Sequence, residues 1–205
     1  RYPLYDRASL ACSSEKTAEH IESFSLVELT AIAGIDQLVL TGDVDGDGIN
    51  DLVTTKGSEL LIYNGDGTLK SSINLPQPCF AAMLEDFDGD GVLDIGLGSS
   101  DKAYIYKSDG TQLKVFHGPF AGTSQISMRP IGLTETHVLM GYQAGYIGRP
   151  RGMGAFDRTT AESLWYYQIG PGCDGFSVAD MYGDGKLYVT NASITVHNGA
   201  SGNNT

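Results

Sequence analysis

A short acidic loop that occurs twice at a fixed spacing constrains the fold of this chain more than any other feature. The first copy, DVDGDGIND, begins at Asp43, and the second, DFDGDGVLD, begins 43 residues later at Asp86. Both copies have carboxylates at positions 1, 3, 5 and 9 and glycines at positions 4 and 6. Carboxylates this close repel one another unless a cation neutralises them, and glycine permits the necessary curl because it accepts positive φ. A chain that repeats such a loop in register is expected to repeat the structure around it.

The residue types predict calcium as the cation. Calcium binds about six to eight oxygen atoms from carboxylates, backbone carbonyls and water, and it tolerates irregular geometry. We expect side-chain ligands at positions 1, 3, 5 and 9, a carbonyl ligand at position 7, and a closing ligand at position 9 that uses one or both oxygens. An acidic surface turn would explain one copy, but the repetition favours two calcium sites. The expected ligands are Asp43, Asp45, Asp47, Ile49 and Asp51 in the first loop and Asp86, Asp88, Asp90, Val92 and Asp94 in the second.

The segments around each loop predict four short strands per unit. The first unit places its strands at 36–40, 52–54, 59–63 and 69–75, with an Asn-Gly-Asp-Gly hairpin signal at 64–67. The second unit repeats these elements through 80–84, 95–97, 103–106 and 113–116. A four-stranded antiparallel sheet that recurs at this period is typical of a β-propeller blade.

The sequence therefore predicts an all-β fold, a β-propeller of four-stranded antiparallel blades. About four blades fit in this chain, which is also compatible with a fragment of a larger propeller. We expect an arm or linker at 1–22 and propeller repeats over 23–205. The predicted blade units are 35–77, 78–121, 122–172 and 173–205, with an additional strand at 23–29.

The later units have lost ligands. The loop of the third unit is expected at 129–137, where every carboxylate ligand is missing, so no calcium is expected there. The fourth loop, 180–188, keeps Asp180 and Asp184 but has tyrosines at positions 3 and 9. A third calcium site in this loop would have an incomplete ligand set.

The fourth unit has only three expected strands, the last at Ile194–His197. The strand at 23–29 could supply the missing outer strand and close a four-bladed ring, or it could pair with a neighbouring molecule and build a filament by strand addition.

Residues 24–35 also resemble the start of a type IV pilin. However, Ser23 stands where pilins need glycine, and Asp36 ends the apolar run.

An insertion in the third unit is the candidate recognition site. It lies between the second and third strands of the unit, whereas the metal loops join first to second strands, so we expect it on the opposite face. Arginine and tyrosine on such a loop suit acidic or sugar ligands, although a solvated loop that offsets local acid remains the alternative. The candidate ligand-binding residues are Tyr142, Tyr146, Arg149 and Arg151.

The two intact motifs carry a family resemblance. GDVDGDGINDLV and EDFDGDGVLDIGLG resemble the calcium loops of FG-GAP or VCBS-type repeats, found in integrin α-subunit propellers and in many bacterial secreted proteins. The resemblance extends from about Ser23 to the C-terminus, with two complete and two degraded motifs. It implies a calcium-binding β-propeller with a role in adhesion or ligand binding.

Composition limits partners and location. The formal net charge of −12 argues against nucleic acid, because phosphate binding depends on clustered Lys and Arg, and no apolar run reaches the length of a membrane span. Cys12, Cys79 and Cys173 allow one disulfide, whose pairing the sequence leaves open. Acceptor triplets for glycosylation begin at Asn191 and Asn203. With the calcium loops, these features predict an extracellular or cell-surface location.

Two functional classes remain open. The preferred one is a calcium-stabilised binding, adhesion or structural module that recognises a glycan or a protein. The alternative is the propeller domain of a carbohydrate-active enzyme such as a polysaccharide lyase. Trp165 and its two tyrosine neighbours suit either a sugar platform or, more commonly, strand packing. The histidines are scattered, and the sequence names no catalytic residue.

Overall fold

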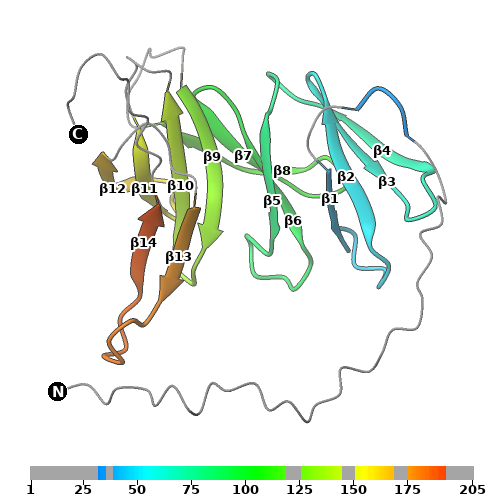
Figure 1. Cartoon of the computed structure of the whole chain (residues 1–205). Helices are drawn as coiled ribbons and strands as arrows, with labels where there is room; N and C mark the ends of the chain where they lie inside the picture. The colour runs from blue at the N-terminus through cyan, green and yellow to red at the C-terminus, as the bar shows by residue number, and fades with distance from the viewer. Residues whose placement is uncertain (1–31, 36–38, 119–125, 145–150, 169–174, 193–205) are drawn as a thin grey trace, which may run out of the picture. The chain divides into compact units, whose positions relative to one another are not determined.

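The computed structural model describes residues 32–35, 39–118, 126–144, 151–168 and 175–192. Within these ranges every regular element is a β-strand, arranged in three four-stranded antiparallel sheets and one two-stranded sheet (Figure 1). The described part contains no helix long and apolar enough to cross a bilayer. The expected arm at 1–22 and strand at 23–29 lie outside the described residues.

Each four-stranded sheet is a meander in chain order, as the blade prediction requires. The first contains β1 (Val39–Gly42), β2 (Asp51–Lys56), β3 (Glu59–Tyr63) and β4 (Leu69–Asn74). The second contains β5 (Ala81–Glu85), β6 (Asp94–Gly98), β7 (Lys102–Tyr106) and β8 (Gln112–His117). The third contains β9 (Ile126–Leu133), β10 (His137–Ala144), β11 (Gly152–Asp157) and β12 (Ser163–Gln168), and the hairpin contains β13 (Gly175–Ala179) and β14 (Tyr188–Ala192).

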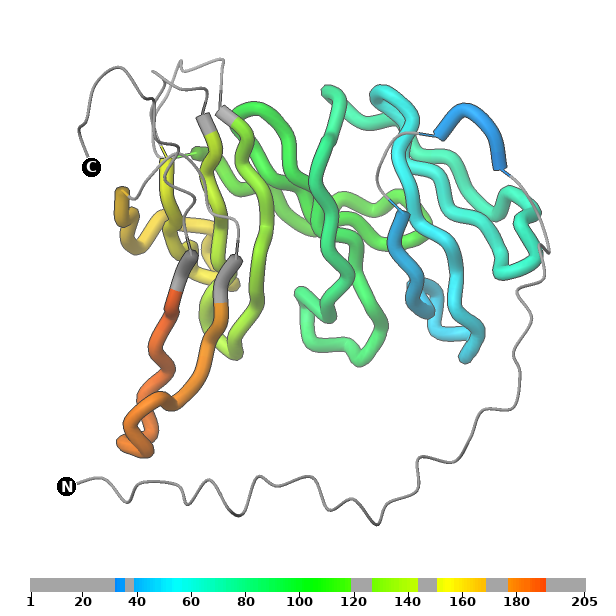
Figure 2. Tube along the Cα trace, viewed as in Figure 1, coloured from blue at the N-terminus to red at the C-terminus, as the bar shows by residue number. Residues whose placement is uncertain are grey.

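The second sheet packs against the first sheet on one face and against the third on the other, so its inner strands are buried on both sides. In Figure 2 the chain passes from the cyan first sheet through the green second sheet to the third, with contacts from β5 to β1 and β9. Strand β7, sequence KAYIY, divides its side chains between two cores: Tyr104 and Tyr106 face the first sheet, and Ala103 and Ile105 face the third. The period of two along a strand explains this division.

Glycines in β6 let the third sheet approach closely. Ile95 and Leu97 point into the core shared with the first sheet. On the other side of the strand, a Cβ added to Gly98 would overlap the carbonyl oxygen of Met128 and lie 2.8 Å from Arg129 Cα. The packing of β9 on β6 thus depends on the missing side chain.

The third unit departs from the expected loop placement. The prediction of a loop over 129–137 is wrong, because β9 continues to Leu133 and β10 begins at His137. Gly132, expected in the loop, pairs with Leu139 in the sheet. The connection is a tight turn closed by the Thr134 N–H, which donates to the His137 carbonyl at 2.9 Å. Without carboxylates to hold around a cation, this segment extends the sheet ladder.

The fourth unit is described only as the hairpin β13–β14. The expected strand at Ile194–His197 lies outside the described residues, as does its proposed partner at 23–29. The ring-closing and filament hypotheses therefore stay predictions.

The described Cys79 is a buried free thiol whose burial raises its pKa to about 12.

Candidate metal centre

The two acidic loops, which join β1 to β2 and β5 to β6, have the same backbone design. The position-1 carboxylate accepts backbone N–H groups on both oxygens: Asp43 from Gly46 at 2.7 Å and from Gly48 at 2.8 Å. Asp86 does the same with Gly89 at 2.6 Å and Gly91 at 2.9 Å. All four glycines have positive φ, between 78° and 88°. The loop therefore curls around its first carboxylate.

These N–H groups also stabilise the charge of the carboxylate. The pKa of Asp43 lies below its usual value, chiefly because the Gly48 N–H donates to it.

The position-9 carboxylates close each loop from inside the sheet. Asp51 and Asp94 begin β2 and β6, and each is 1% exposed. Asp51 Oδ2 accepts the Val44 N–H at 3.3 Å, and Asp94 Oδ2 accepts the Phe87 N–H at 2.8 Å. Because these bonds take one oxygen, the structure presents the other oxygen, Oδ1, to the loop interior.

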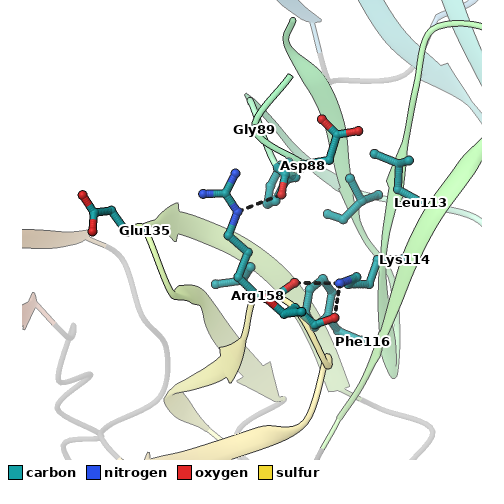
Figure 3. A pocket seen from close by; sticks show the side chains of 11 residues that line it. Asp88, Gly89, Leu113, Lys114, Phe116, Glu135 and Arg158 are labelled. Carbon is teal, nitrogen blue, oxygen red and sulfur yellow. Dashed lines mark hydrogen bonds between the residues drawn. The ribbon is translucent and has the colours of Figure 1, made fainter. Parts of the chain in front are cut away.

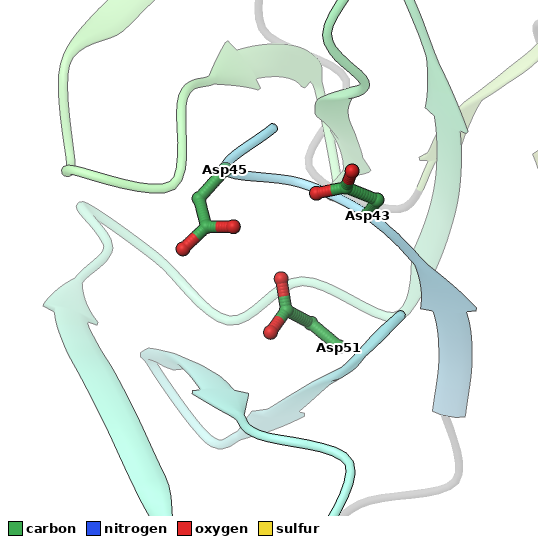
Figure 4. A group of neighbouring side chains, drawn as sticks. All are labelled: Asp43, Asp45 and Asp51. Atoms are coloured by element: carbon green, nitrogen blue, oxygen red, sulfur yellow. The ribbon is translucent and has the colours of Figure 1, made fainter. Parts of the chain in front are cut away.

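Carboxylate oxygens converge inside each loop. Oxygens of Asp43, Asp45 and Asp51 lie within 4.8 Å of one another, and the three side chains point toward a common centre (Figure 4). Asp86, Asp88 and Asp94 form the equivalent group in the second loop. These two groups contain six of the eight predicted side-chain ligands.

The remaining two, Asp47 and Asp90, stand at position 5. Each accepts the N–H of position 7 with Oδ1, from Ile49 at 2.8 Å and from Val92 at 2.9 Å. Their Oδ2 atoms face the same lysine as oxygens of positions 3 and 9, as the next contacts show.

A lysine reaches into each group of carboxylates. Lys70 Nζ, from β4, lies 2.5 Å from Asp45 Oδ2, 3.5 Å from Asp47 Oδ2 and 2.8 Å from Asp51 Oδ1. The Asp45 carboxylate, followed by that of Asp51, raises the pKa of Lys70 above its usual range. The lysine thus holds its proton and its charge in this setting.

The second loop contains the same arrangement. Lys107 Nζ lies 2.8 Å from Asp88 Oδ2, 2.6 Å from Asp90 Oδ2 and 3.9 Å from Asp94 Oδ1. The oxygens again belong to positions 3, 5 and 9. The bond from Lys107 lowers the pKa of Asp90, whereas burial, and then the neighbouring Asp88, raises the pKa of Asp94 to about 6.

Sequence reasoning missed both lysines because they do not occupy equivalent positions. The register pairs Tyr63 with Leu69 in the first sheet and Tyr106 with Gln112 in the second, which confirms the 43-residue offset. At this offset Lys70 corresponds to Leu113, and Lys107 corresponds to Asn64. Comparison of repeated positions does not reveal a lysine that stands on a strand in one unit and after a strand in the other.

The fourth loop keeps the curl without the full set of carboxylates. Gly183 and Gly185 have positive φ, and Asp180 accepts the Gly185 N–H at 2.8 Å. At positions 3 and 9, the rings of Tyr182 and Tyr188 pack edge to face at 4.8 Å. The Tyr188 hydroxyl donates to Asp184 Oδ2 at 2.9 Å, so tyrosines take the place of two carboxylates.

Of the four predicted recognition residues, the structure describes Tyr142 and Arg151, and both contact Tyr166. Tyr146 and Arg149 lie outside the described residues. Tyr142 is 1% exposed and packs edge to face on Tyr166, which contradicts the exposure expected for it. Arg151 is half-buried, and its backbone N–H donates to the Tyr166 hydroxyl at 3.0 Å. Elsewhere on β12, Trp165 is 40% and Tyr167 67% exposed.

A cavity of about 510 Å³ lies beside the second loop, between the second and third sheets (Figure 3). Arg158, which follows β11, donates from Nε to the Phe87 carbonyl at 2.8 Å and from Nη2 to the Asp86 carbonyl at 2.7 Å. Lys114 Nζ donates to the Arg158 carbonyl at 2.7 Å. Arg158, at the edge of the third sheet, thus binds the backbone of the second acidic loop.

Comparison with known proteins identifies the repeat. Residues 43–97 match the model of the FG-GAP-like repeat family, a range that begins with the first loop and includes the second. No curated protein gives a significant match.

Two solved structures resemble the chain in fold. A crystal structure of BBS1N in complex with ARL6DN, soaked with lead, matches with a TM-score of 0.53 and 17% identity over 78% of this chain and 55% of that chain. A second crystal of the same complex, soaked with mercury, matches with a TM-score of 0.53 and 16% identity over 80% of this chain and 57% of that chain. The chain thus spans little more than half of those structures, and the similarity confirms a β-propeller fold.

Proposed function

We propose that this chain, an FG-GAP-repeat β-propeller, is a calcium-stabilised binding module that recognises a partner protein outside the cell or at its surface. The fold and the repeat support a binding or structural module. Calcium, the location and the partner are the parts that this proposal adds.

The donor set of each loop fits calcium. Every converging side-chain atom is a carboxylate oxygen, the ligand type that hard divalent cations prefer. A positively charged group, the lysine ammonium, already lies among the oxygens of positions 3, 5 and 9. The proposed ligands are the side chains at positions 1, 3, 5 and 9 with the position-7 carbonyl, and position 9 contributes one oxygen. We do not extend the proposal to the fourth loop.

Calcium would supply charge neutralisation and a cross-link at the first turn of a blade. Position 9 begins the second strand and position 1 follows the first, so an ion held by both ties the two strands together. The observation that carries this proposal is the repetition: two loops direct the oxygens of the same three positions to one point.

The partner is proposed from the similar propeller and from surface chemistry. BBS1N was crystallised in complex with another protein, ARL6DN. In this chain, β12 exposes Trp165 and Tyr167, and aromatic side chains of this kind are enriched in protein interfaces. Arg151, whose backbone N–H donates to the Tyr166 hydroxyl, would add charge beside this strand.

A calcium titration followed by thermal melting tests the metal proposal. Calcium should raise the melting temperature, because an ion bound only by the folded state stabilises it by about 2.7 kcal/mol at a hundredfold excess over Kd. Chelator should reverse the shift. The double variant Asp45→Asn, Asp88→Asn should lose most of the calcium-dependent shift.

The matched control is Glu162→Gln, which removes an exposed carboxylate near the third sheet and outside both loops. It should keep the full shift. A wild-type melting temperature that ignores calcium, or a control that responds like the double variant, would contradict the proposed sites.

A further inference from the structure

We propose that each acidic loop carries its own competing cation, a lysine ammonium, and that displacement of this lysine sets the calcium affinity of the loop. Lys70 performs this role in the first loop and Lys107 in the second. The inference rests on the calcium sites proposed above and assigns them a regulator that belongs to the chain itself.

The ammonium groups lie among the carboxylates of positions 3, 5 and 9. At positions 3, 5 and 9, one oxygen of each carboxylate is directed toward the lysine Nζ. In the first loop, the other oxygens accept backbone N–H groups at 3.3 Å, 2.8 Å and 3.3 Å. Each ammonium therefore occupies the point to which the remaining oxygens are directed. In each loop the ammonium lies within 3 Å of two of these oxygens, so it and a metal ion at that point exclude each other.

Two different sequence positions produce the same contact. Lys70 reaches its loop from β4, whereas Lys107 reaches its loop from the residue after β7. Each unit has one lysine at these two positions and an uncharged residue, Asn64 or Leu113, at the other. Both lysine side chains are mostly covered, at 24% and 29% exposed. An incidental surface ion pair would not be expected to find the same three oxygens twice.

A loop with four carboxylates needs positive charge to stay curled when no metal is bound. One ammonium supplies part of that charge and so supports the metal-free loop. Calcium brings two positive charges to the same oxygens and must first release the lysine, whose flexible stem can carry the ammonium into solvent. The lysine thus stabilises the metal-free state and weakens calcium binding.

Isothermal titration with single-site proteins tests the affinity. Lys70→Met in an Asp88→Asn background isolates the first loop, and Lys107→Met in an Asp45→Asn background isolates the second. Each methionine should tighten calcium binding roughly tenfold, because a like charge near a divalent ion is removed. In chelator, the same variants should melt at a lower temperature than their backgrounds. Lys56→Met, at the exposed end of β2, is the control and should change neither quantity.

A second measurement uses the unaltered protein, so it does not depend on the folding of a variant. Amine-reactive labelling, read by mass spectrometry, should increase at Lys70 and Lys107 when calcium is added, and labelling of Lys56 should stay constant. Unchanged labelling, or variants that bind calcium as their backgrounds do, would overturn the lysine proposal while leaving the calcium sites intact. Wild-type protein that binds no calcium in the titration would instead overturn the sites, and the lysine proposal with them.

Discussion

The position-9 aspartates show how one residue can serve both the sheet and the loop. Asp94 begins β6 and is 1% exposed, and one of its oxygens accepts a hydrogen bond from the Phe87 N–H. A buried carboxylate that lacks a close cation is costly to ionise. Lys107 is 3.9 Å from its other oxygen, farther than the 2.8 Å between Lys70 and Asp51. Asp94 therefore depends on a cation more than its counterpart does.

This dependence predicts an effect of pH on the metal-free protein. The pKa of Asp94 is about 6 in the folded chain, compared with an ordinary 3.8, so the folded state holds the proton more tightly. Stability from this residue is therefore present at low pH and is lost as pH rises through 6. The variant Asp94→Asn has no carboxylate to ionise, so it does not lose this stability as the pH rises. The free energy of unfolding of the variant minus that of wild type should therefore increase by about 2 kcal/mol between pH 4 and pH 7. Urea denaturation in chelator measures this difference.

Saturating calcium supplies the control for that experiment. Calcium requires an ionised Asp94, so the difference between Asp94→Asn and wild type should then fall with rising pH. A metal-free difference that stays flat from pH 4 to pH 7 would show that the carboxylate is not buried as the structure describes.

Among the elements, the inner strands show what the alternating pattern could predict. The strands expected around the first two loops were confirmed, because the two units share hairpin residues and apolar alternation at the same offset. The loop of the third unit was placed wrongly at 129–137, because position counting assumed a loop where β9 continues to Leu133. Ladder pairing extends a strand when no carboxylates compete for the backbone N–H groups.

Gly98 is the position at which a strand is most sensitive to added volume. Gly98→Ala would push a methyl group into the Met128 carbonyl on β9, and overpacking of this kind costs about 1–3 kcal/mol. We expect a lower midpoint of urea denaturation with an unchanged slope. The neighbouring exposed Ser100→Ala is the control and should be nearly neutral. Equal stability of the two variants would mean that β6 and β9 are not in direct contact.

Across the molecule, contacts between sheets connect one blade to the metal loop of another. Arg158, from the third sheet, donates to the carbonyls of Asp86 and Phe87 in the second loop. These charged hydrogen bonds hold the residue that supplies the position-1 carboxylate. The third unit therefore supports a proposed calcium site although it has none of the acidic ligands itself.

Arg158→Met should weaken calcium binding at the second loop only. The loss of two charged hydrogen bonds is expected to cost about 1–2 kcal/mol, which corresponds to roughly a tenfold weaker Kd if the loop loses its order. Calorimetry in the Asp45→Asn background reads the second loop, and the Asp88→Asn background reads the first loop as the internal control. Equal effects on both loops would point to general destabilisation in place of local support.

The sequence by itself determined the repeat, the β class and the eight acidic positions, because these depend on local spacing. Strand alternation, hairpin residues and the glycines that accept positive φ all act over a few residues, so they can be recognised without a fold.

Only the tertiary structure decided which other groups meet at the acidic loops. Lys70 lies on β4, Lys107 follows β7, and Arg158 follows β11 of the third sheet. Likewise, the sequence marked Tyr142 as an exposed recognition residue, but packing against Tyr166 buries it. Contacts between residues distant in the chain depend on how sheets stack, and the 43-residue period carries no information about charges that differ from one repeat to the next.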